Sequence, residues 1–224
     1  YGLDFSLPRI VRPAAASFSP TAAAQFSAAG GDINAEGADL VLDGKTRKVL
    51  MQAPKNGFFY VLDRETGQLI SADKYAPVTW ASQVDMKTGR PVETAEANYS
   101  RETRLIVPAP FGAHNWHPMA FNPQTGLVYI PAMQPMGIYA LSEEFKATGK
   151  YPRRDMFWNP GLDWNTYTDT IYALLEQFNG KLPPDRGFIK AWDPVQKKTV
   201  WEIEHPGFWN GGMLTTAGNL LFQG

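Results

Sequence analysis

The sequence predicts an all-β protein, built as a partial β-propeller of about three to four blades with a long, mostly irregular insertion. Short apolar runs alternate with turns that begin with Asp or Asn and end with Gly. A strand–turn–strand unit recurs, because Gly57 and Asp63 match Gly187 and Asp193 at a common spacing of 130 positions. The composition (20 Gly, 18 Pro, 7 Trp, 9 Tyr and 13 Phe) favours many short strands and turns over long helices.

The chain of 224 residues divides into unequal parts. Residues 1–37 form an atypical segment rich in Ala, Ser and Pro with little periodicity, so we expect a loop or disorder there. Residues 38–224 carry the β pattern and are predicted to form the partial propeller. Within them, residues 139–185 do not fit a blade and are interpreted as an insertion over one rim. Because both ends look cut, with no initiating Met and a strand-like end at residues 221–224, we interpret the chain as a fragment.

The first predicted unit begins near residue 48. Residues 48–53 and 57–62 are apolar and β-branched or aromatic, which is typical of strands. Residues 63–67 predict a turn, because the first side chain is Asp, which can accept bonds from its own backbone, and the last residue is Gly, which tolerates positive φ. Residues 68–71 then return as a third strand.

Later segments repeat this chemistry. Residues 85–89 and 122–126 have the same turn pattern, and residues 127–130 follow the second of these turns as a strand. Residues 187–194 are a further copy of strand and Asp turn, and residues 199–203 complete it. A recurring unit of this kind predicts a propeller at about 40–50 residues per blade.

Composition excludes several function classes. The net charge is −1 and no long basic run occurs, so nucleic acid is not an expected partner. No stretch approaches about 18 consecutive apolar residues, which leaves at most a peripheral association with a membrane. The absence of Cys excludes disulfides and thiolate catalysis within the chain. Neither a nucleophile elbow, nor a P-loop, nor a dinucleotide-binding glycine motif is present.

Lys55 is the first candidate site residue, because it is a charge planted at the end of a predicted strand. It is either an ordinary surface lysine or a donor to a ligand oxygen that gains charge during reduction. The sequence pattern leaves both readings open.

A second candidate is the loop in which Asn115 and Trp116 lie between His114 and His117. The functional reading is that the amide bonds a polar ligand edge and the indole lies against its rim. His-x-x-His can bind a transition metal, but only distant His205 could complete the ligand set, so we expect no metal site. The alternative is a pair of loop histidines bonded to backbone carbonyls.

A third candidate is Trp209 with Asn210, which two glycines follow. Glycines permit close approach of the backbone to a planar ligand, although Asn-Gly also makes simple turns. Trp192 and Trp201 lie inside the repeat and are expected to pack between blades. Trp80 is expected to end a strand in a structural role.

Four strings of sequence resemble the quinoprotein alcohol dehydrogenases, which use pyrroloquinoline quinone (PQQ), and resemble most the ethanol or quinohemoprotein type. The strings are residues 53–67, 112–134, 191–194 and 209–218, so the resemblance covers residues 38–224 apart from the insertion. It implies the C-terminal part of an eight-bladed propeller whose blades dock through tryptophans, with the quinone near the axis.

The resemblance also implies site residues. Lys55 would contact the quinone oxygens, Asn115 and Trp116 would approach the polar edge of its ring, and Trp209 with Asn210 would line the pocket. The implied reaction is oxidation of primary alcohols to aldehydes by hydride transfer to the quinone, whose carbonyl is polarised by calcium. Electrons would pass to a cytochrome c in the periplasm, and the parent protein of the quinohemoprotein type would carry haem c.

This chain departs from the family pattern upstream of Lys55. Alignment backward from the lysine puts Ala28 where the family has its catalytic aspartate, and Asp32 is out of register. The catalytic residue is therefore unknown in this chain, the calcium ligands are expected outside it, and it contains no Cys-x-x-Cys-His haem motif. The fragment alone is expected to be inactive, and the alternative function is a non-catalytic propeller scaffold or an inactive remnant.

Overall fold

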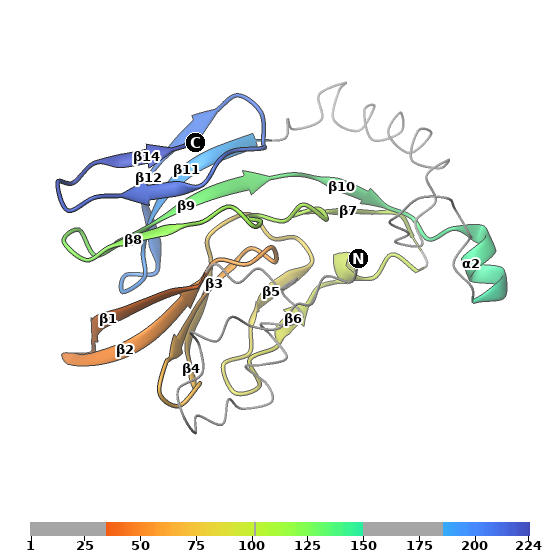
Figure 1. Ribbon diagram of the computed structural model, residues 1–224. Helices are drawn as coiled ribbons and strands as arrows, with labels where there is room; N and C mark the ends of the chain where they lie inside the picture. Colours follow the sequence, from red (N-terminus) through yellow and green to blue (C-terminus); the bar gives the residue numbers. More distant parts are fainter. Residues whose placement is uncertain (1–34, 101, 150–185) are drawn as a thin grey trace, which may run out of the picture.

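The computed structural model describes residues 35–100, 102–149 and 186–224. These residues form mostly antiparallel β-structure, with two four-stranded and three two-stranded sheets (Figure 1). Most of the atypical segment 1–37, including Ala28 and Asp32, and residues 150–185 of the predicted insertion lie outside the described residues. Within the described ranges, no helix has the length and apolarity needed to cross a membrane.

The first four-stranded sheet is an antiparallel meander in the order β1-β2-β3-β4. The strands predicted around residues 48–53, 57–62 and 68–71 are confirmed as its second, third and fourth members. The strands are β1 (Glu36–Leu42), β2 (Lys45–Gln52), β3 (Phe58–Asp63) and β4 (Leu69–Lys74).

The second four-stranded sheet has the order β12-β11-β9-β8 and is also antiparallel. The predicted repeat is confirmed at this level, because β3 and β11, which carry the matched segments, are each the third strand of their sheet in chain order. The strands are β8 (Ala120–Asn122), β9 (Leu127–Gln134), β11 (Arg186–Asp193) and β12 (Lys198–His205).

Smaller elements connect and follow the two large sheets. Three antiparallel pairs are β5 (Ala81–Val84) with β6 (Pro91–Glu93), β7 (Arg104–Ile106) with β10 (Gly137–Tyr139), and β13 (Met213–Thr215) with β14 (Leu221–Gln223). A short 3₁₀ helix, η2 (Ala95–Ala97), precedes β7.

One short helix lies near the start of the predicted insertion. Helix α2 (Glu143–Thr148) lies within residues 139–185. The hydroxyl of Ser142 accepts a hydrogen bond from the Phe145 backbone N–H and caps its first turn, and Gly149 ends it in the left-handed conformation. The capping residues can be identified in the sequence, but the segment has no apolar residues at helical spacing, so the helix was not predicted.

The predicted turns are confirmed, and their side chains behave as expected. One carboxylate oxygen of Asp63 accepts bonds from the backbone N–H groups of Glu65 and Thr66 at 3.0 and 2.9 Å. Asp85, Asn122 and Asp193 make the same pair of contacts in their own turns. These turns fix where each strand pair reverses.

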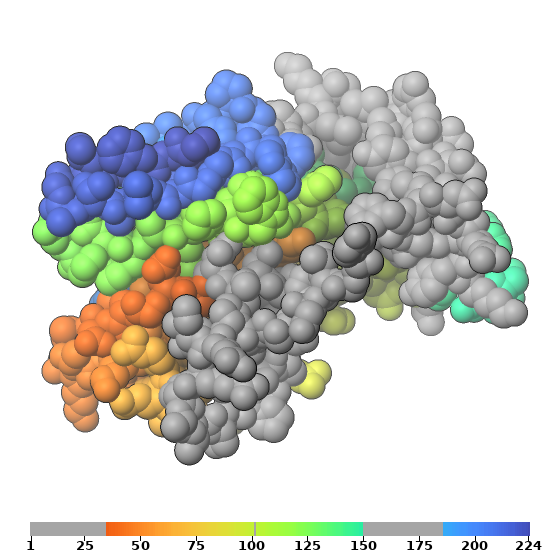
Figure 2. All heavy atoms as spheres, viewed as in Figure 1, coloured from red at the N-terminus to blue at the C-terminus, as the bar shows by residue number. Residues whose placement is uncertain are grey.

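The core lies between the two four-stranded sheets, whose side chains meet directly (Figure 2). Phe59 on β3 and Trp192 on β11 join the sheets, with ring centroids 5.6 Å apart. Trp192 is 3% exposed, so its predicted packing role is confirmed, whereas Trp201 on β12 is 38% exposed and contacts Tyr129. The buried cluster also includes Leu40, Val49, Met51, Val61, Val128, Ile130 and Phe188.

Candidate functional site

One loop, residues 107–118 between β7 and β8, carries Asn115 and Trp116 and is bonded to the segment that carries Lys55. The backbone N–H of Ala113 donates to the carbonyl of Lys55 at 2.9 Å, and the N–H of Met133 donates to the carbonyl of Ala113 at 2.7 Å. Because Lys55 follows β2 and Met133 belongs to β9, the loop is fixed to both large sheets.

Lys55 lies in the connection between β2 and β3, as the sequence predicted, and is half-buried. The hydroxyl of Tyr75 donates to the neighbouring Pro54 carbonyl at 2.8 Å, which holds this connection down on the core. Among the described residues, the Lys55 ammonium forms none of the ion pairs that engage other lysines. Its charge therefore remains available to a ligand on this part of the molecule.

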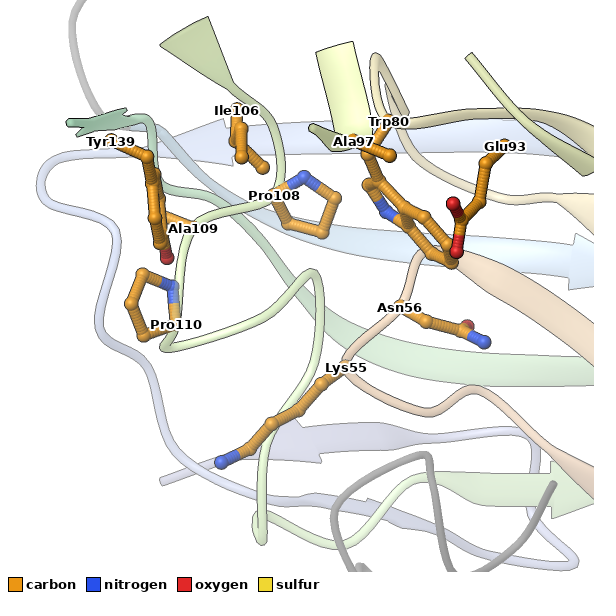
Figure 3. A pocket seen from close by; sticks show the side chains of 10 residues that line it. All are labelled: Lys55, Asn56, Trp80, Glu93, Ala97, Ile106, Pro108, Ala109, Pro110 and Tyr139. Carbon is orange, nitrogen blue, oxygen red and sulfur yellow. The ribbon is translucent and has the colours of Figure 1, made fainter. Parts of the chain in front are cut away.

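The stem of Lys55 forms part of the wall of a cavity of about 390 Å³. Figure 3 shows its ammonium directed away from Trp80 and Glu93, which lie across that cavity. None of the other four predicted cofactor-binding residues lines this cavity. The wall comprises Lys55, Asn56, Trp80, Glu93, Ala97, Ile106, Pro108, Ala109, Pro110 and Tyr139.

Two aromatic residues of the cavity wall have structural contacts. Trp80 packs edge-on against Phe58, with ring centroids 6.3 Å apart, and comes directly before β5 rather than at the end of a strand as expected. Burial raises the pKa of the Tyr139 hydroxyl, and nearby Tyr99 adds to the shift. That hydroxyl is therefore neutral at physiological pH.

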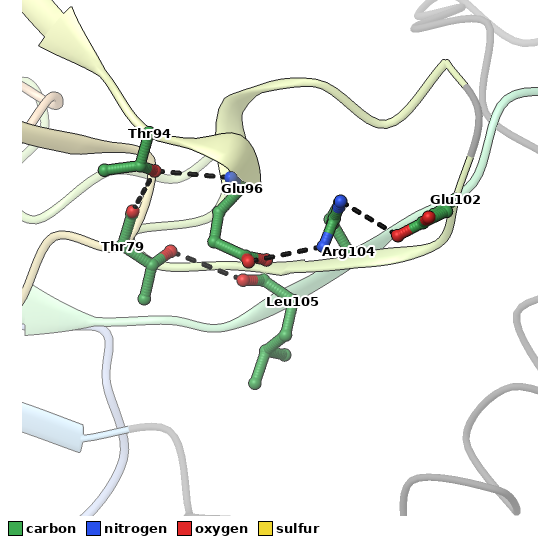
Figure 4. Close-up of polar contacts among 6 residues, drawn as sticks. All are labelled: Thr79, Thr94, Glu96, Glu102, Arg104 and Leu105. Carbon is green, nitrogen blue, oxygen red and sulfur yellow. Dashed lines mark hydrogen bonds and ion pairs between the residues drawn. The ribbon is translucent and has the colours of Figure 1, made fainter.

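A polar network holds the elements behind this cavity in place (Figure 4). The hydroxyl of Thr94 donates to the Thr79 carbonyl at 2.6 Å, and Arg104 pairs with Glu96 and Glu102 at 3.4 and 2.9 Å. These contacts tie η2 to β7. Ala97 of η2 and Ile106 of β7 both line the cavity. Their role is thus to support the wall.

An aromatic cluster joins the loop 107–118 to a second loop. Its members are Phe111, Trp116 and His117 from the first loop and Phe208 and Trp209 from the second. The Trp116 ring stacks on His117 with centroids 4.2 Å apart, and Trp209 meets His117 and Phe111 edge-on at 4.8 and 5.8 Å. Phe208 contacts both Phe111 and Trp209. Three of the rings are strongly exposed: Trp116 at 61%, Phe111 at 49% and Trp209 at 47%.

Sequence reasoning identified Trp116 and Trp209 but missed Phe111 and Phe208. The available signal was an aromatic residue next to a glycine in both loops, Phe111-Gly112 and Gly207-Phe208. Exposed aromatic rings clustered from two loops provide a surface on which a flat ligand can lie.

Asn115 has a local structural role, because its side chain contacts the backbone of its own loop. Its amide N–H donates to the carbonyl of Phe111 at 2.9 Å, and its oxygen accepts from the N–H of Trp116 at 2.8 Å. The side chain is buried. Asn115 thus shapes the loop that carries two members of the aromatic cluster.

Asn210 offers a different feature, a buried acceptor. Its amide N–H donates to the Ala132 carbonyl at 3.0 Å and approaches His205 at 3.4 Å. Its Oδ1 atom is buried and has no hydrogen-bond partner among the described residues. An unsatisfied buried acceptor costs about 1–3 kcal/mol, so this oxygen favours a bound donor.

The structural alternative for the histidine loop, ring nitrogens bonded to backbone carbonyls, is confirmed for His114. Its two ring nitrogens lie 2.6 Å from the carbonyl oxygens of Ala53 and His117, which leaves neither nitrogen for a metal. Burial lowers the pKa of His114, and the two carbonyl contacts oppose that shift. Across the described ranges, no group of three His, Asp or Glu side chains gathers as a metal site.

Comparison with known proteins points to one group of enzymes, although no protein-family model matches the chain. It is 50% identical over 188 residues to quinohemoprotein alcohol dehydrogenase ADH IIB of Pseudomonas putida, covering 84% of this chain and 25% of that protein. It is 42% identical over 189 residues to the 1-butanol dehydrogenase (cytochrome c) of Thauera butanivorans, covering 84% and 26%.

A solved structure supports the same relationship. The crystal structure of quinohemoprotein alcohol dehydrogenase from Comamonas testosteroni matches with a TM-score of 0.69 and 41% identity, over 84% of this chain and 27% of that one. The chain therefore spans about a quarter of the length of the relatives it matches.

Proposed function

We propose that this chain, which is homologous to the quinohemoprotein alcohol dehydrogenases over about a quarter of their length, is part of a PQQ-dependent alcohol dehydrogenase and supplies cofactor-binding loops. The two four-stranded antiparallel sheets then correspond to blades of its propeller, and residues 38–224 to the C-terminal part of that propeller, interrupted by the insertion at 139–185. The observation that carries the proposal is the loop 107–118, which joins Lys55 to the aromatic cluster.

Lys55 is the residue with the most direct role. Its ammonium donates a hydrogen bond to a quinone oxygen, and a fixed positive charge stabilises that oxygen as it gains electron density. Support comes from its half-buried position and from the lack of an ion pair to any described carboxylate. A cation already paired to a carboxylate would be partly neutralised and less effective.

The remaining predicted residues divide into ring contacts and polar contacts. Trp116 and Trp209 present exposed indoles to the flat ring system, and Phe111 packs edge-on against Trp209. Asn210 supplies the buried acceptor that lacks a donor. Asn115 acts by holding the loop in shape.

When bound, PQQ supplies the hydride acceptor for oxidation of a primary alcohol to an aldehyde. Calcium, its ligands and the catalytic base belong to parts of the parent protein outside the described residues. The parent passes electrons to a cytochrome c in the periplasm and, if it is of the quinohemoprotein type, contains haem c. Its relative in Thauera butanivorans is by name a 1-butanol dehydrogenase that uses cytochrome c.

A second candidate function is a non-catalytic scaffold of the same ancestry. The observation that favours it is Ala28 at the position where the family resemblance places the catalytic aspartate. The two functions differ in one property that can be measured, because a scaffold has no need to bind the quinone.

Lys55→Met tests the proposed cofactor contact. Loss of one charge-assisted hydrogen bond is expected to weaken PQQ binding by about ten- to hundredfold, measured by titrating the chain with PQQ and calcium and following the quinone absorbance. Lys87→Met, at an exposed position in the turn after β5, is the matched control and should bind as the unmodified chain does. A folded chain that binds no quinone would support the scaffold instead.

A further inference from the structure

We propose that Gly112 is a positioning residue for Lys55: the backbone of the loop at Gly112 packs against the lysine stem and fixes where the ammonium points. The role of that ammonium in cofactor binding rests on the proposed function. The packing itself does not, since it follows from contacts between two segments 57 positions apart in the sequence.

The contact leaves no space for a side chain at position 112. A Cβ atom added to Gly112 would lie 2.5 Å from both Cβ and Cγ of Lys55 and 2.7 Å from its Cα. Real Cβ atoms essentially never approach other heavy atoms this closely. Gly112 also has φ +83°, in the left-handed region that favours glycine. Two independent requirements therefore call for glycine at this position.

The backbone on both sides of the contact is held by hydrogen bonds. The Gly112 N–H donates to the Ala109 carbonyl at 2.8 Å, and the Ala113 N–H donates to the Lys55 carbonyl at 2.9 Å. On the side of the cavity, the stem of Lys55 is one of the lining groups, as are Pro108 and Pro110 (Figure 3). The first torsions of the lysine are thus restricted before any ligand binds.

This restriction matters because lysine is otherwise a flexible cation. A lysine on the surface loses much rotamer freedom when its ammonium is fixed, and that loss weakens binding. Among the described residues, no carboxylate pairs with the Lys55 ammonium to fix it from its far end. Gly112 fixes it from the near end and leaves the charge available.

The test compares Gly112→Ala with Gly126→Ala in the full chain. Gly126 is the matched control, because it also has a positive φ, +69°, but an added Cβ there meets nothing within 4 Å. Gly112→Ala is expected to weaken PQQ binding about tenfold, and Gly126→Ala to change it less than twofold. In a Lys55→Met background, Gly112→Ala should change binding less than twofold. An equal loss in both backgrounds would overturn the proposal.

A second measurement needs no quinone. The lysines are dimethylated with ¹³C and the Lys55 signal is assigned with Lys55→Arg. Gly112→Ala should shift that signal, and Gly126→Ala should not. An unchanged signal would overturn the proposal, even if the chain binds no PQQ and the proposed function has failed. Should Gly112→Ala not fold, the Cβ methylene of Lys55 in the unmodified chain must be less mobile by NMR relaxation than that of Lys87, and equal mobility would overturn the proposal.

Discussion

Trp192→Ala is expected to lower the free energy of unfolding by about 3–5 kcal/mol. Trp192 is 3% exposed and packs against Phe59, which belongs to the other four-stranded sheet. Removing the indole leaves a cavity where the two sheets meet, and the packed sheets can move together only partly to fill it. Urea unfolding followed by circular dichroism measures the change.

Trp201→Ala is the matched control for this prediction. Both tryptophans lie in the same repeated unit, on the neighbouring strands β11 and β12, but Trp201 is 38% exposed. Its loss should cost clearly less, about 1–2 kcal/mol, because more than a third of its surface already contacts solvent. Equal costs for the two substitutions would contradict the placement of the core between the sheets.

His114→Ala is expected to lower the free energy of unfolding by about 2–4 kcal/mol. The ring is buried, and its nitrogens contact the carbonyls of Ala53 and His117 at 2.6 Å. A neutral imidazole has one N–H, so the substitution removes one donated hydrogen bond and the packing of the ring. It also leaves one of these two carbonyls, whichever one the ring N–H bonds, without its donor.

His205→Ala provides the comparison for His114. His205 is partly exposed, and its nearest polar contacts are longer, at 3.5 Å to the Pro206 carbonyl and 3.4 Å to Asn210. Its loss should cost less than about 1 kcal/mol. If His205→Ala were as destabilising as His114→Ala, burial of His114 would not be the reason for its effect.

The same histidine should make stability depend on pH. Burial lowers the pKa of His114 in the folded chain, and an unfolded histidine titrates at about 6.5. Below that pH the unfolded chain binds a proton that the folded chain does not, so stability is lost as pH falls from about 6.5 toward the lowered folded pKa. Above it both states are neutral and this contribution is constant.

Urea midpoints between pH 5 and 8 test this dependence. On acidification, the unmodified chain should lose stability more steeply than His114→Gln, because the glutamine at position 114 does not titrate. A chain that gains stability as the pH falls would show that the two carbonyl contacts outweigh burial and hold the ring as imidazolium.

The sequence by itself determined the local structure of the large sheets. The turns at Asp63 and Asp193 form because an Asp side chain accepts bonds from backbone groups two and three residues later, a choice made within one short segment. The spacing of Gly57 and Gly187 correctly predicted equivalent strands. The position of Lys55 at a strand connection followed from the same pattern.

The tertiary structure alone decided the contacts that build the site. Trp192 and Trp201 look alike in the repeat, but which is buried depends on which face of its sheet meets a neighbour. A neighbouring glycine marks Phe111 and Phe208 locally, but neither their contact with each other nor the packing of Gly112 on Lys55 has a local signal. Each of these contacts joins loops that lie far apart along the chain. Such contacts arise only when packed sheets bring distant loop ends together, and a pattern read over a few residues carries no information about that distance.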